Sequence, residues 1–141
     1  MCFQQQKRAH LIRGIFGSGK SQTLVQVISE LYYKTNFNLF RILIITVTNT
    51  AVDNLIERLK ETKIPSHLIQ RLGTGSSNEE ITDVVKREFS GQCFITATTC
   101  ASVSKCKQQQ FSLLIVDEAS QMRVSELLYI ANNVKVMHVV I

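Results

Sequence analysis

The apolar residues of this chain follow two patterns that alternate along it. Continuous apolar runs, typical of strands buried on both faces of a sheet, occupy residues 41–47, 93–98 and 111–118. Shorter runs predict strands at residues 10–13, 68–72 and 134–141. Apolar residues three or four positions apart predict four helices between them, with these faces: Leu24, Val27, Ile28 and Leu31; Val52, Leu55, Ile56 and Leu59; Ile81, Val84, Val85 and Phe89, behind a cap at Ser77 or Asn78; and Val124, Leu127, Leu128 and Ala131.

Strands that alternate with helices, most of them apolar throughout, predict an α/β fold with a parallel sheet and helices on both faces. With 141 residues, of which 45% are hydrophobic, we expect one domain over residues 1–141. Ligands of such folds lie beyond the carboxyl ends of the strands. Four polar segments fall at that edge: residues 14–21, 48–50, 98–99 and 117–118.

The segment between the first strand and the first helix fits the pattern G-x-x-x-x-G-K-[ST]. Its residues are Gly14, Ile15, Phe16, Gly17, Ser18, Gly19, Lys20 and Ser21. Glycines let successive backbone N–H groups converge on phosphates, Lys20 neutralises the β/γ charge, and Ser21 offers a hydroxyl to Mg²⁺. The N-terminus of the following helix adds partial positive charge. This segment is therefore interpreted as a phosphate-binding loop, against the alternative of a glycine turn that fits by chance.

A second candidate site follows the apolar run at residues 111–116, which ends in Asp117 and Glu118. An acid at the end of a strand, downstream of a phosphate-binding loop, is placed to help hold Mg²⁺, and we assign this role to Asp117. We expect Glu118 to orient or deprotonate the water that attacks the γ-phosphate. The alternative is an acid pair that merely faces solvent.

The composition limits the kinds of partner, metal site and cellular location that we expect for the protein. The formal charge of +5 favours a polyanionic partner but says nothing about the fold. Four cysteines, with no C-x-x-C pair and no histidine at metal-ligand spacing, argue against a zinc site and a disulfide framework. The first residues lack an apolar signal core, and no run is long enough to cross a membrane. We expect an intracellular protein, nuclear or cytoplasmic, with structural cysteines.

Three stretches carry a resemblance to a known family. Residues 113–121 resemble a D-E-A-x-Q motif, residues 48–55 are similar to a motif Ia, and residues 96–99 resemble a motif Ic. Together with the phosphate-binding loop they resemble superfamily 1 helicases of the type of the nonsense-mediated-decay RNA helicase, which move 5′ to 3′. The loop departs from the family at Ile15, Phe16 and Ser21, and its Phe form looks most like a DNA helicase branch with a GRF-type zinc finger.

The resemblance implies the first RecA-like motor domain of an ATP-dependent helicase, incomplete at its C-terminal end, with ATP and Mg²⁺ as cofactors. It implies that single-stranded DNA or RNA is contacted through its backbone by Thr48, Asn49, Thr50, Thr98 and Thr99. Gln121 would couple the nucleotide state to the strand. The alternative from the residues alone is that Asn49 or Thr50 caps a helix and that Thr98 fills a strand.

Two other functions compete with the motor. A small-molecule kinase would need an arginine-rich lid after the sheet, which the sequence lacks. A nucleotide-binding fragment or regulatory module would bind nucleotide without turnover. The resemblance also implies a second RecA-like domain, outside this chain, that supplies an arginine to the γ-phosphate. We therefore expect that this chain alone does not unwind duplexes.

Overall fold

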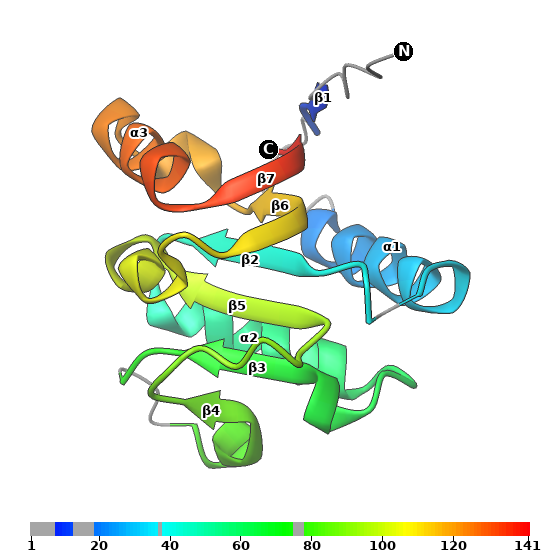
Figure 1. The fold of residues 1–141 in the computed structure, drawn as a ribbon. Helices are drawn as coiled ribbons and strands as arrows, with labels where there is room; N and C mark the ends of the chain where they lie inside the picture. The colour runs from blue at the N-terminus through cyan, green and yellow to red at the C-terminus, as the bar shows by residue number, and fades with distance from the viewer. Residues whose placement is uncertain (1–7, 13–18, 37, 75–77) are drawn as a thin grey trace.

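A parallel sheet forms the centre of the molecule. The computed structural model describes residues 8–12, 19–36, 38–74 and 78–141. Within these residues seven strands lie in the order β1-β7-β6-β2-β5-β3-β4, and every pair is parallel (Figure 1). The strands are β1 (Arg8–His10), β2 (Ile42–Thr46), β3 (Ile69–Leu72), β4 (Val85–Lys86), β5 (Ile95–Thr99), β6 (Gln110–Val116) and β7 (Lys135–Val140). The predicted α/β class with a parallel sheet is confirmed.

Helices connect the strands. The α-helices are α1 (Lys20–Lys34), α2 (Asn49–Lys60) and α3 (Val124–Asn133). Short 3₁₀ helices are η1 (Ser66–Leu68), η2 (Glu79–Val84), η3 (Cys100–Cys106) and η4 (Ala119–Gln121). None of the described helices is both long and apolar enough to cross a bilayer.

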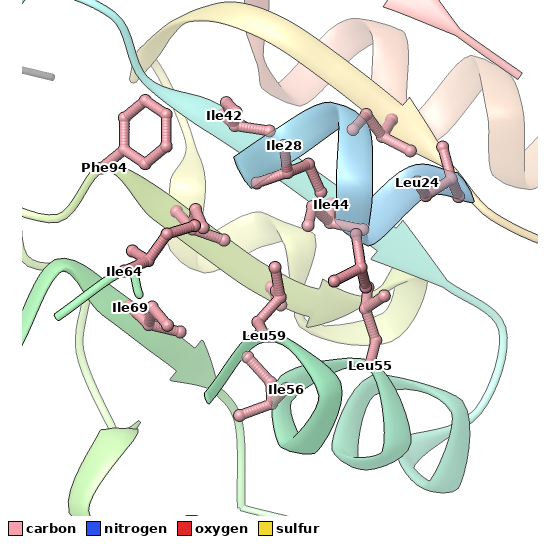
Figure 2. Close-up of a cluster of buried hydrophobic side chains, with 14 of the residues drawn as sticks. Leu24, Ile28, Ile42, Ile44, Leu55, Ile56, Leu59, Ile64, Ile69 and Phe94 are labelled. Atoms are coloured by element: carbon pink, nitrogen blue, oxygen red, sulfur yellow. The ribbon is translucent and has the colours of Figure 1, made fainter. Parts of the chain in front are cut away.

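The core has two layers because successive side chains of a strand point to opposite faces. In β2, Ile42 and Ile44 pack with α1 and α2, whereas Leu43 and Ile45 pack with η3 and α3 on the other face. Figure 2 shows the first layer, in which side chains from α1, α2 and the strands meet. Burying one such side chain contributes about 1.5–3 kcal/mol. Both faces of β2 are therefore covered, as the continuous apolar run predicts.

Two predicted helix faces are partly wrong. In α1, Val27 is 44% exposed, and Val25 is buried with Leu24 and Ile28 instead. In α3, Val124 and Leu128 are 73% and 59% exposed, and the buried residue is Ile130. The spacing of apolar residues says which of them share a face, but neighbouring elements decide which side of the helix is covered. For α3 the covering element is η3.

The helix predicted over residues 79–89 is confirmed only as the short 3₁₀ helix η2, in which Ile81 and Val84 are buried, and its continuation to Phe89 is wrong. The segment from Asn78 forms η2 and then β4, which pairs in parallel with β3. Pairing of β4 satisfies backbone groups that the outer side of β3 would otherwise leave open. The predicted cap is confirmed at Asn78, whose side-chain oxygen accepts from the Glu80 backbone N–H at 2.9 Å.

The first strand lies earlier than predicted. β1 ends at His10, although hydrogen bonds from Ile12 N to Ile141 O (2.7 Å) and from Ile141 N to His10 O (2.8 Å) extend the contact with β7. Arg13 lies outside the described residues. The pairing brings the segment before the predicted phosphate-binding loop beside β7.

Candidate functional site

The start of α1 has a glycine N-cap and no acidic residue in its first turn. Gly19 is its N-cap residue with φ 80°, a left-handed conformation that favours glycine, while an added Cβ would meet no atom within 4 Å. The requirement for glycine is therefore conformational. The first turn of α1 contains no acidic residue, so the positive end of the helix dipole is not neutralised within it. Lys20 and Ser21 are its first two residues.

The other members of the predicted loop cannot be placed. Gly14, Ile15, Phe16, Gly17 and Ser18 lie outside the described residues. Their contacts with nucleotide stay predictions.

The acid pair lies directly after β6. Asp117 continues the pairing with β2, since its N–H donates to Ile45 O at 3.0 Å. Glu118 has φ 57° and ψ 34°, the left-handed region, which for a residue with a Cβ costs about 1–3 kcal/mol. The Asp117 carboxylate supports this turn by accepting from the Glu118 N–H at 3.0 Å. Strain of this kind persists where the surroundings impose it, and it is common at functional sites.

Two cavities meet at this acid pair. The larger, of about 430 Å³, has Lys20, Ile12 and Leu127 in its wall, and its lining is mostly apolar. The smaller, of about 250 Å³, has Ser21, Thr48, Thr50, Asn54 and Arg58 in its wall. Asp117 and Glu118 line both cavities. The structure thus brings Lys20 and Ser21 from α1 to the end of β6.

This donor set fits a magnesium nucleotide. Mg²⁺ is usually held by one or two carboxylates together with phosphate oxygens and water, and a hydroxyl and a carboxylate are present here in Ser21 and Asp117. In the described part of the chain, no group of three or more histidine, cysteine or acidic side chains forms a metal cage.

The polar residues after β2 form a helix start at the surface. Thr48 is the N-cap of α2, and its hydroxyl accepts from the Ala51 N–H at 3.2 Å. The cap is thus Thr48, whereas the alternative considered above placed it at Asn49 or Thr50. Asn49 and Thr50 are exposed, and the Asn49 Oδ1 accepts from Arg71 Nη2 at 2.9 Å. Thr48 and Thr50 line the smaller cavity.

The threonines at the end of β5 have a different environment. Thr98 is fully buried and its hydroxyl donates to Leu72 O at 3.1 Å; Thr99 is also buried. Thr98 thus fills the strand interior, as the alternative considered above has it, and neither side chain is at the surface. Gln121 is exposed at the end of η4 and lines neither cavity described above. Contacts of these three residues with a ligand stay predictions.

The cysteines that the structure describes are buried free thiols. Burial raises the pKa of Cys93 and of Cys100, and it raises the pKa of Cys106 to about 12. Thiols of raised pKa are poor nucleophiles, because the reactive form is the thiolate. The structural interpretation is confirmed for these three; Cys2 lies outside the described residues.

Sequence reasoning missed an ion pair beside the site. Arg71 and Asp53 form a buried pair with 3.0 Å between Nε and Oδ1. The signal was a charged residue inside the predicted strand at residues 68–72, since a charge there needs a partner. The partner belongs to another element and could not be named from local pattern.

Parts of this chain are similar in sequence to known proteins. The family described as "AAA domain" matches residues 1–91. The DNA polymerase alpha-associated DNA helicase A of Schizosaccharomyces pombe is 41% identical over 59 residues, which are 42% of this chain and 8% of that protein. The RNA helicase aquarius of Mus musculus is 31% identical over 113 residues, or 78% of this chain and 7% of that protein. The chain thus spans less than a tenth of the length of either relative.

Solved structures share the fold. The UvsW helicase of bacteriophage T4 aligns with a TM-score of 0.63 and 18% identity, covering 95% of this chain and 46% of that chain. The restriction-modification enzyme LlaGI aligns with a TM-score of 0.70 and 15% identity, covering 96% and 15%. These likenesses support the fold alone. The family match covers well over half of the chain, including the predicted phosphate-binding loop and the start of α2. The chain therefore belongs to the AAA domain family.

Proposed function

We propose that this chain is the ATP-binding part of a helicase motor, which couples hydrolysis of Mg·ATP to movement on single-stranded DNA or RNA. The observation that carries the proposal is the smaller cavity, where Ser21, Asp117 and Glu118 share a wall with Thr48 and Thr50. Candidate groups for hydrolysis and for strand binding thus meet in one space. The names of the two relatives, a DNA helicase and an RNA helicase, support the same class.

Different residues of the site bind different parts of the Mg·ATP. Lys20 balances negative charge at the β- and γ-phosphates, while the first turn of α1 contributes its dipole. Ser21 and Asp117 hold the Mg²⁺ that comes with the nucleotide. The larger cavity, which Lys20 also lines, has a mostly apolar wall.

The reaction itself is phosphoryl transfer to water. Bound Mg·ATP supplies the γ-phosphoryl group and a cation that neutralises its developing charge. Glu118 accepts a proton from the attacking water or orients it, and the turn stabilised by Asp117 fixes its backbone. Turnover at full rate requires an arginine that we assign to a second RecA-like domain, so we propose binding and at most slow hydrolysis for this chain alone.

The test uses the purified chain and a fluorescent ATP analogue with Mg²⁺, titrated with and without a single-stranded oligonucleotide. A motor domain requires that the strand change nucleotide affinity, and by linkage the nucleotide must change strand affinity by the same factor. Phosphate release is followed in parallel over a range of protein concentrations. Absence of nucleotide binding refutes the proposal, and binding without reciprocal coupling favours a passive nucleotide-binding module.

A further inference from the structure

Arg71 is the largest fully buried side chain in the described part of the chain. It lies in β3, and its guanidinium donates to three partners. Nε donates to the Asp53 carboxylate at 3.0 Å, Nη2 donates to Asn49 Oδ1 at 2.9 Å, and Nη1 reaches Leu72 O at 3.4 Å. One cation therefore joins the first two turns of α2 to the end of β3.

Gly73 leaves room for this arrangement. Its φ is +124°, and an added Cβ would lie 2.8 Å from Arg71 Nη1 and 3.2 Å from the Ser102 hydroxyl. Both the backbone conformation and the space thus require glycine beside the guanidinium. The backbone is shaped to admit the arginine.

Stability alone does not account for a buried ion pair of this kind. Apolar residues of similar volume often stabilise a core as well as or better than a buried pair, because desolvating two charges is costly. What a guanidinium adds is direction, since its donors form a rigid planar fork. The groups that it contacts are consequently held in a fixed orientation.

The orientation of Asn49 follows from this chemistry. A guanidinium only donates hydrogen bonds, so the oxygen of the Asn49 amide must face Arg71. The two N–H groups of Nδ2 are left for another partner, and among the described residues this side chain makes no other hydrogen bond. Asn49 is exposed at the first turn of α2; its sequence neighbours Thr48 and Thr50 line the smaller cavity, whereas Asn49 itself does not. It therefore offers donors to an acceptor that comes from outside.

We propose that Arg71 is a positioning residue that holds Asn49 as a fixed donor to a phosphate oxygen of a single-stranded nucleic acid. The inference rests on the proposed function. It adds that Asn49 is the hydrogen-bond donor in this contact and that Arg71 fixes its orientation. Donors at a fixed position suit a phosphate, which only accepts, and they carry no preference for a base. A phosphate oxygen also occurs in the nucleotide, so strand and nucleotide binding are measured separately.

The deciding variant is Asn49→Asp. A carboxylate keeps the bond to Arg71 and suits the start of a helix, so the fold and the affinity for Mg·ATP should be unchanged. The variant removes both N–H donors and adds a negative charge where the phosphate should lie. We expect the affinity for a labelled single-stranded oligonucleotide to fall about 10- to 100-fold. Asn132→Asp, the same change at an exposed position of α3, is the matched control and should lose less than about twofold.

The role of Arg71 is tested by Arg71→Lys, which keeps the charge and removes the fork. We expect about tenfold weaker strand binding at a temperature where the variant is fully folded, with nucleotide affinity unchanged. The side-chain amide signals of Asn49 in nitrogen-15 NMR should shift in this variant. Unchanged strand affinity in Asn49→Asp, or an unshifted amide in Arg71→Lys, overturns the inference. Failure of the parent chain to bind any strand instead overturns the proposed function, and with it this ligand.

Discussion

β5 and β6 lie on either side of β2 and end at the same edge of the sheet, yet the residues at their carboxyl ends have opposite surroundings. After β6, Asp117 and Glu118 line two cavities, and η4 behind them contains no buried residue. After β5 the chain passes into η3, which buries three residues, and Thr98 and Thr99 are covered. A position at the carboxyl edge of the sheet is thus not sufficient to make a residue part of a site. The path of the chain after each strand decides whether the residues there stay accessible to a ligand.

The largest expected effect is on ATP hydrolysis, from a change of Glu118, which follows β6 and lines both cavities. Glu118→Gln should bind Mg·ATP within about twofold of the parent, while strand-stimulated phosphate release falls about 10²- to 10⁴-fold, because an amide cannot accept the proton. The measurement is single-turnover phosphate release in a form of the protein that hydrolyses ATP. Loss of Mg·ATP binding in this variant would show that the roles of Glu118 and Asp117 are assigned wrongly.

Lys20→Ala should weaken binding of a fluorescent ATP analogue about 100-fold, because it removes the cation at the start of α1 and leaves phosphate charge uncompensated. Lys107→Ala, which removes an exposed cation beyond η3, is the control and should bind as the parent does. Equal affinity in both variants would refute the phosphate-binding loop.

At the end of β5, where the side chains are buried, Thr98→Val should lower stability and leave the binding of single-stranded nucleic acid unchanged. Valine has nearly the same shape but leaves the buried Leu72 carbonyl without this donor, at a cost of about 1–3 kcal/mol. Urea unfolding measures the loss, and Thr98→Ser should retain most of the stability. If Thr98→Val is fully stable but binds strands weakly, Thr98 belongs to the strand site and the contrast between β5 and β6 fails.

The smallest expected effect is a gain. Glu118→Gly should raise the free energy of unfolding by up to about 1 kcal/mol, since glycine adopts a left-handed backbone without the penalty of a Cβ. Such a gain, together with lost turnover, would identify Glu118 as a residue kept for function at the expense of stability. A loss of stability would instead show that the Glu118 side chain stabilises the fold.

The pattern of apolar and polar residues predicted those elements of the fold whose formation depends on burial alone. The run at residues 41–47 became β2 because only a strand covered on both faces needs apolar residues at successive positions. Parallel pairing then placed Ser21, Thr48 and Asp117 at one edge. This much of the site followed from local pattern and one rule about parallel sheets.

The remaining features depend on contacts between distant segments. The exposure of Val27 and the burial of Ile130 reflect which neighbour covers each helix, and β4 formed where β3 offered open backbone groups. The burial of Thr98 follows from the path of η3. Arg71 bonds to Asp53 and Asn49, which both lie in α2. No pattern within the segment around Arg71 could identify them.

The place of β7 in the sheet has a consequence for the order of folding. β7 lies between β6 and β1, and β1 has no other neighbour among the described strands. During synthesis β1 therefore has no pairing partner until β7 (Lys135–Val140) has been made, whereas the edge of β6 that pairs with β7 stays open only for the shorter time between β6 (Gln110–Val116) and β7. Contacts between such distant segments form slowly, and unpaired edges promote aggregation. The chain should thus be most dependent on chaperones just before β7 leaves the ribosome.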